Sequence, residues 1–175
     1  MNRRLAINIA LATAAGIFLI PSCMQEKSKP DIVLKNINVS GDQQKMLADL
    51  AEIIIPKTSS PGAADLSTHQ FALMMVDDCY DPELRSKFEK GIAEFESLSK
   101  NNFGNSFIKC SGEQKEKLIN TMENQKDAVE GAAFFYNNFK KLAIQSFTSS
   151  QYYLTKIHVY ELVPGRFHGC VPLIK

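Results

Sequence analysis

The chain of 175 residues has no tryptophan and only three histidines, and neither sign of charge dominates it. Lysine and arginine number 20 against 19 aspartate and glutamate residues, which gives a formal net charge of +1. No long run of one charge is present to attract nucleic acid, so we expect no nucleic-acid partner. Hydrophobic residues make up 45% and charged residues 22% of the chain, which is typical of a globular protein rather than a disordered or fibrous one.

The common signatures of catalytic and nucleotide-binding sites are also missing. The chain contains no GxGxxG, P-loop, GxSxG or HExxH sequence. Asp65 and His69 are one helical turn apart, but many capping pairs have the same spacing, so the spacing alone does not indicate a catalytic or metal site. Asp77 and Asp78 are neighbours, so on a helix they point about 100° apart and do not face one substrate as an acid and a base would. We predict no catalytic, cofactor-binding or metal-binding residue in this chain.

The N-terminal segment has the pattern of an export signal. Arg3 and Arg4 precede a mostly apolar stretch over residues 5–20, and a basic region followed by an apolar one is typical of a signal peptide. The stretch is shorter than the roughly 20 apolar residues of a transmembrane helix. The paired arginines also permit the twin-arginine route, which exports folded proteins.

The signal ends in a sequence that resembles a lipobox. Residues 19–23 read LIPSC, in which a small residue precedes Cys23. We therefore expect residues 1–22 to be a lipoprotein-type export signal and Cys23 to be lipidated after its removal. Simple secretion and an uncleaved anchor are the alternatives.

The rest of the chain predicts one helical domain behind a tether. Residues 23–39 are polar and lack a helical period until their end, so we expect a flexible tether there. In residues 40–175 apolar side chains recur at steps of three and four, and no segment alternates as a strand would. The prediction is an all-α, single compact domain of about six helices with an irregular C-terminal tail.

The helix starts are predicted from capping residues. Ser40–Gln43 and Ser111–Gln114 each match a capping box, and Pro82 follows Asp81 at the first position of another helix. The six helices are expected to begin after Ser40, after Asp65 or Ser67, at Pro82, after Ser111, near Ala132 and after Ser150.

Two stretches of this domain carry a resemblance to a known family. The first, residues 52–80, reads EIIIPKTSSPGAADLSTHQFALMMVDDCY, and the second, residues 160–173, reads YELVPGRFHGCVPL. Together they resemble the gluconate 2-dehydrogenase subunit 3 family. The similarity covers roughly residues 43–173, and its specificity comes from the combination of IIPxTxxPGA, a following F…DCY helix and a terminal PGxxxGCVPL.

The resemblance implies a small accessory subunit without redox chemistry of its own. Such subunits pair with a large flavoprotein of the glucose–methanol–choline oxidoreductase type, which holds FAD, oxidises sugars or sugar acids outside the cytoplasm and often passes electrons to a cytochrome c subunit. The large subunit frequently lacks an export signal, so the small one would carry it across the membrane. The expected location is the periplasm or cell envelope, with a lipid anchor to the membrane.

The resemblance also implies roles for the residues that build its motifs. We expect them to set loop geometry and to dock onto the large subunit. These residues are Pro56, Thr58, Pro61, Gly62, Cys79, Pro164, Gly165, Gly169 and Cys170.

Both motifs contain a cysteine, which makes Cys79 and Cys170 candidates for a disulfide. The bond would close a loop of roughly 90 residues and stabilise the domain by about 4 kcal/mol in the chain-entropy model. Cys110 paired with either of them, or three reduced thiols, are the alternatives.

A second function stays open from the sequence. The chain would then be a stand-alone envelope lipoprotein with a scaffolding or carbohydrate-binding role, and the resemblance would report the fold alone. This alternative predicts a monomer without a large exposed apolar patch, whereas a true subunit would bury on the order of 1,200 Å² or more against its partner.

Overall fold

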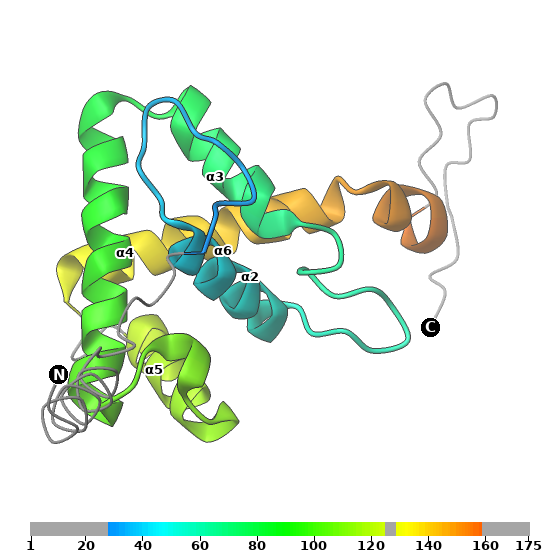
Figure 1. Ribbon diagram of the computed structural model, residues 1–175. Helices are drawn as coiled ribbons and strands as arrows, with labels where there is room; N and C mark the ends of the chain where they lie inside the picture. Colours follow the sequence, from blue (N-terminus) through cyan, green and yellow to red (C-terminus); the bar gives the residue numbers. More distant parts are fainter. Residues whose placement is uncertain (1–27, 125–128, 159–175) are drawn as a thin grey trace, which may run out of the picture.

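The computed structural model describes residues 28–124 and 129–158. Regular secondary structure in these residues is helical, without a strand, so the all-α prediction is confirmed (Figure 1). The elements are α2 (Gly41–Ile54), α3 (Thr68–Cys79), α4 (Pro82–Phe103), the 3-10 helix η1 (Phe107–Lys109), α5 (Gly112–Asn124), α6 (Glu130–Thr148) and the π-helical turn η2 (Tyr153–Ile157). No helix of the described ranges is long and apolar enough to cross a membrane.

Local sequence signals account for several of the helix starts. The Ser40 hydroxyl accepts a hydrogen bond from the Gln43 backbone N–H at 3.3 Å, and the Gln43 side chain accepts one from the Ser40 N–H at 2.9 Å. The same reciprocal pair forms between Ser111 and Gln114. Asp81 accepts from the backbone N–H of Leu84 at 2.9 Å. Each bond satisfies a donor at a helix N-terminus that would otherwise lack a partner, so these predictions are confirmed.

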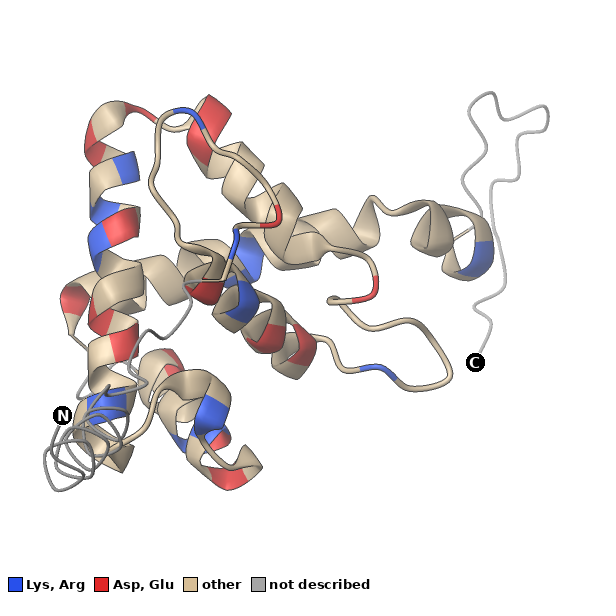
Figure 2. Ribbon diagram, viewed as in Figure 1, with Lys and Arg blue, Asp and Glu red and all other residues tan. Residues whose placement is uncertain are grey.

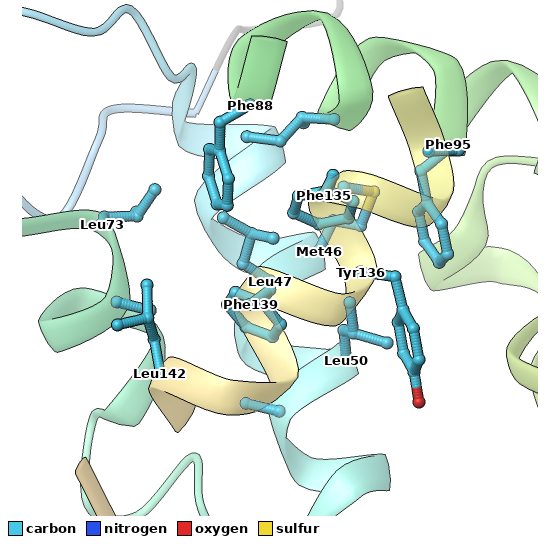
Figure 3. Close-up of a cluster of buried hydrophobic side chains, with 14 of the residues drawn as sticks. Met46, Leu47, Leu50, Leu73, Phe88, Phe95, Phe135, Tyr136, Phe139 and Leu142 are labelled. Atoms are coloured by element: carbon cyan, nitrogen blue, oxygen red, sulfur yellow. The ribbon is translucent and has the colours of Figure 1, made fainter. Parts of the chain in front are cut away.

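The core forms where α4 and α3 pack against α6. Phe135 of α6 is fully buried and lies edge-on to Phe88 and Phe95 of α4, with ring centroids 5.2 and 5.6 Å apart. Figure 3 shows these rings with Leu47 and Leu50 of α2 around the same cluster. Edge-to-face pairs of this kind stabilise by about 1 kcal/mol beyond burial of their area. Phe135 and the fully buried Phe139 are therefore the core phenylalanines of α6.

The segment before α2 is part of this packed unit, which corrects the predicted tether. We call residues 28–39 the N-terminal strap. Its Ile37 and Val39 are only 5% and 6% exposed, and Figure 1 shows it running in front of α2 and α3. The folded unit therefore begins at least twelve residues earlier than residue 40, and only residues 23–27 of the predicted tether lie outside the described residues.

Side chains of two helices hold the strap by its backbone. Gln44 of α2 accepts from the backbone N–H groups of Asp31 and Ile32 at 2.8 and 3.1 Å, and its own amide donates to the Ile32 carbonyl at 2.9 Å. Gln44 is 1% exposed. A buried side-chain amide without hydrogen-bond partners is costly. The hydrogen bonds therefore fix the strap backbone and at the same time supply the partners that the buried Gln44 amide needs.

Candidate functional site

The α2–α3 loop, residues 55–67, carries four of the predicted motif residues. It projects from the C-terminal end of α2, away from α4 (Figure 1). Pro56 and Thr58 are exposed, Pro61 is half-buried and Gly62 is buried. The structure thus brings the four residues into one loop but divides them between an exposed tip and a buried base.

Glu52, in the last turn of α2, organises the base of this loop. Its carboxylate accepts from the backbone N–H of Lys57 at 2.8 Å and from that of Ala64 at 3.2 Å. The two donors lie on opposite sides of the loop tip, so one side chain ties both limbs of the loop to α2. A carboxylate bound by N–H donors forms stronger hydrogen bonds than neutral acceptors do, which makes the loop a defined structure.

Gly62 lies directly against this carboxylate. A Cβ atom at residue 62 would overlap both carboxylate oxygens of Glu52. The glycine of the PGA motif is therefore needed for close approach to Glu52. The motif and the glutamate form one structural unit.

The role of Glu52 was missed at the sequence level, although a signal existed. The helix macrodipole disfavours a negative charge in the last turn of a helix, and α2 has no basic residue in that turn to offset it. A glutamate in the last turn of a helix, four residues before a proline, is favourable when backbone N–H groups of the following loop bind its carboxylate.

Asp65 closes the second limb of the loop rather than capping α3. Its carboxylate accepts from the Gly62 N–H at 3.2 Å and lies 3.0 Å from the Lys57 ammonium group. The Lys57 hydrogen bond, followed by the Gly62 N–H, lowers the pKa of Asp65. The predicted capping role is wrong for Asp65, and Ser67 makes no capping hydrogen bond either; its φ of +51° lies in the left-handed region.

His69 lies in the first turn of α3 and is 5% exposed. Its Nδ1 has no hydrogen-bond partner among the described residues. Burial lowers the pKa of His69, and the negative charge of Asp31 opposes this effect. Asp65, one turn away in sequence, is bound to Lys57 and Gly62, so the pair is not assembled as a site. In the described part of the chain no group of three His, Cys, Asp or Glu residues is placed to hold a metal ion.

Asp77 has a structural function near the end of α3. Its carboxylate accepts from the backbone N–H groups of three successive strap residues, Lys35, Asn36 and Ile37, at 2.9, 2.6 and 2.9 Å. Burial by itself raises the pKa of Asp77, but the three N–H donors outweigh it, and the pKa is lowered overall. Its neighbour Asp78 is exposed, so the two carboxylates do not form a pair.

The described cysteines differ in their surroundings. Cys79 ends α3 and is exposed, whereas Cys110 is 7% exposed and its thiol lies 3.3 Å from the Ser99 hydroxyl and 3.5 Å from the Ser106 carbonyl oxygen. Five predicted site residues lie outside the described residues: Cys23, Pro164, Gly165, Gly169 and Cys170. The Cys79–Cys170 disulfide therefore stays a prediction.

Charge does not mark the α2–α3 loop as a site. Figure 2 shows basic and acidic residues interspersed along α4, and a mostly uncharged α2–α3 loop. Lys57 and Asp65, the charged residues of this loop, pair with each other. A surface with its own charges paired favours recognition by shape and hydrogen bonding rather than by electrostatic attraction.

Comparison with known proteins gives one match. The family model described as gluconate 2-dehydrogenase subunit 3 matches residues 41–165, which is well over half of the chain and includes the α2–α3 loop and every helix of the described residues. No curated protein and no solved structure matches the chain.

Proposed function

Since the chain belongs to the gluconate 2-dehydrogenase subunit 3 family, we propose that it is the small accessory subunit of an exported, FAD-dependent sugar or sugar-acid dehydrogenase. Its function is to bind and stabilise a large catalytic subunit of the glucose–methanol–choline type. The FAD belongs to that partner, and a cytochrome c subunit accepts the electrons.

The observation that carries this proposal is the α2–α3 loop within the matched region. Its base is bound internally by Glu52 and Asp65, while Pro56 and Lys57 on the first limb and Thr58 at the tip remain exposed. A preformed loop loses little conformational entropy when it binds a partner. We assign the docking contact to this tip.

The export signal supplies the second half of the proposal. Residues 1–22 direct the chain across the membrane, Cys23 receives the lipid, and Arg3 and Arg4 allow a folded flavoprotein to travel with it. The complex then works in the cell envelope, anchored through the small subunit.

Affinity purification of the tagged full chain from its native host tests the proposal. The expected result is a stoichiometric flavoprotein with the absorbance spectrum of bound flavin, and a haem spectrum if the cytochrome is retained. Purification of the chain without a flavoprotein would favour the stand-alone lipoprotein instead.

A substitution at the loop tip tests the assigned contact. Thr58→Asp places a charge on an exposed side chain and is expected to reduce recovery of the flavoprotein about tenfold, the effect of losing roughly 1.4 kcal/mol of binding free energy. Ser97→Asp, on an exposed position of α4, is the matched control and should leave recovery unchanged. Equal recovery with both variants would move the contact away from the loop.

A further inference from the structure

The strap determines how far the domain can stand from a lipid anchor. We propose that the domain lies against the bilayer surface, with the end formed by the start of α2, the end of α4 and η1 facing the lipid headgroups. The proposal rests on the lipidation of Cys23 proposed above.

The first step is the length of chain between the lipid and the packed domain. If residues 23–39 were free, sixteen peptide steps would allow a reach of about 55 Å. The strap contacts the domain from Ser28 onward, which leaves five steps and a reach of at most about 17 Å. The point where the chain leaves the domain is therefore held within about 17 Å of Cys23, which is less than the roughly 30 Å diameter of a small domain.

The second step is where the chain leaves the domain. The Ser28 hydroxyl donates a hydrogen bond to Asp42 in the first turn of α2. Gly41 is buried beneath the same residues, and a Cβ atom there would overlap the Ser28 carbonyl and Lys29. The exit point is therefore held against the N-terminal end of α2, and this end of the molecule is nearest to the anchor.

The third step is the surface around the exit point. Asp42 also lines a groove of about 770 Å³ whose other walls are the end of α4 and η1, with Lys100, Ile108 and Lys109 among the lining residues. Ile108 is 44% exposed, and Lys109 is exposed beside it.

An apolar side chain next to lysines is the composition that binds at the interface of an anionic bilayer. The groove is lined by two acids, Asp42 and Glu96, and by two lysines, Lys100 and Lys109, so it carries no net formal charge. Glu96 pairs with Lys100 at 2.8 Å, and Asp42 accepts from Ser28. The groove thus presents Ile108 and Lys109 to phospholipid headgroups.

This orientation separates two ends of the molecule. α2 has 14 residues and is about 21 Å long, and the α2–α3 loop begins at its far end. With the start of α2 at the bilayer, the loop tip is directed away from the lipid and stays accessible to a large aqueous partner.

Lysine labelling of the lipidated full chain tests the orientation. The protein is reconstituted in vesicles of phosphatidylethanolamine and phosphatidylglycerol and treated with a membrane-impermeant amine reagent, and the labelled sites are measured by mass spectrometry. We expect labelling of Lys109 to fall several-fold relative to the unlipidated Cys23→Ala chain, while labelling of Lys57 in the α2–α3 loop stays the same.

A lengthened anchor is the matched control. Sixteen Gly and Ser residues inserted between Lys27 and Ser28 add a root-mean-square span of about 22 Å without touching the packed strap, and they should restore labelling of Lys109. Equal labelling of Lys109 with and without vesicles, or protection of Lys57 as strong as that of Lys109, would overturn the proposal.

The vesicle experiment also separates this inference from the proposed function. Failure of the full chain to associate with vesicles, with an N-terminal peptide lacking lipid in the mass spectrum, would overturn the orientation. Purification of the flavoprotein is measured independently of the vesicles, so either result can fail alone.

Discussion

At the scale of single residues, this protein repeatedly uses carboxylates that accept hydrogen bonds from backbone N–H groups to fix irregular segments. Glu52 ties together the two limbs of the α2–α3 loop, and Asp77 holds three consecutive N–H groups of the strap. In each case a helix supplies the acid and an irregular segment supplies the donors. Segments without regular hydrogen bonding of their own are thereby given defined conformations.

Gly62→Ala should destabilise the domain by about 2 kcal/mol, because the added methyl group overlaps Glu52 and forces one of them to move. The free energy of unfolding in urea is the measurement. Gly112→Ala is the control, because nothing lies within 4 Å of a Cβ atom at that position, and its change should stay within about 0.5 kcal/mol. Equal effects of the two substitutions would contradict the role assigned to Gly62.

Asp77→Asn should cost about 3 kcal/mol at pH 7, since an amide accepts fewer hydrogen bonds and carries no charge for the three N–H donors. The folded pKa of Asp77 is lowered, so its contribution is present above the unfolded value of about 3.9 and is lost as the pH falls through the folded pKa. The difference between wild type and variant should therefore shrink in urea titrations as the pH is lowered below about 4. A difference that does not vary with pH would exclude the charged carboxylate as its cause.

At the scale of elements, the strap behaves as a structural element despite having no regular secondary structure. Ile37 and Val39 point into the core, whereas Val33 is 89% exposed. Its polar composition resembles that of a linker, but the side-chain acceptors that bind its N–H groups and the apolar residues that cover it lie on helices that follow it in the chain. A tether was expected because a local pattern does not report partners 12 to 50 residues away.

Truncating a buried and an exposed side chain of the strap tests whether packing of the strap stabilises the domain. Ile37→Ala should lower the free energy of unfolding by about 3 kcal/mol, as expected for loss of a buried branched side chain. Val33→Ala removes an exposed side chain from the same segment and should change stability by less than about 0.5 kcal/mol. Thermal or urea unfolding measures both variants, and a similar small effect of both would mean that the strap detaches in solution.

At the scale of the whole molecule, the strap and the α2–α3 loop lie at opposite ends of α2. This arrangement fits a subunit that joins a membrane to a partner, with α6 and its aromatic neighbours as the rigid body between them (Figure 3).

Peptide mapping without reduction tests the predicted covalent link across the domain. We expect a Cys79–Cys170 peptide from the exported protein, because Cys79 is exposed while the Cys110 thiol is buried between Ser99 and Ser106. Reduction should then lower stability by about 4 kcal/mol, the loop-closure value for roughly 90 residues. Recovery of a Cys79–Cys110 peptide would contradict this pairing.

Much of the fold follows from local rules that can be seen in the sequence alone. The capping boxes at Ser40 and Ser111, the Asp81 cap and the three- and four-residue apolar steps determine the helices, because their hydrogen bonds and faces involve residues within one or two turns. The two motifs were also sufficient to indicate the family. The helix that follows residue 65 shows the limit of such rules, since Asp65 has a good capping side chain but binds Lys57 instead.

The tertiary structure alone decided which irregular segments are ordered and what orders them. The strap depends on Gln44 and Asp77, and the α2–α3 loop depends on Glu52, through contacts that close only when the helices pack. The sequence contains these acids and amides, but the geometry that pairs them with distant N–H groups arises from burial of the shared core. For this reason the helices were predicted from composition and spacing, while the strap's path and the base of the loop were not.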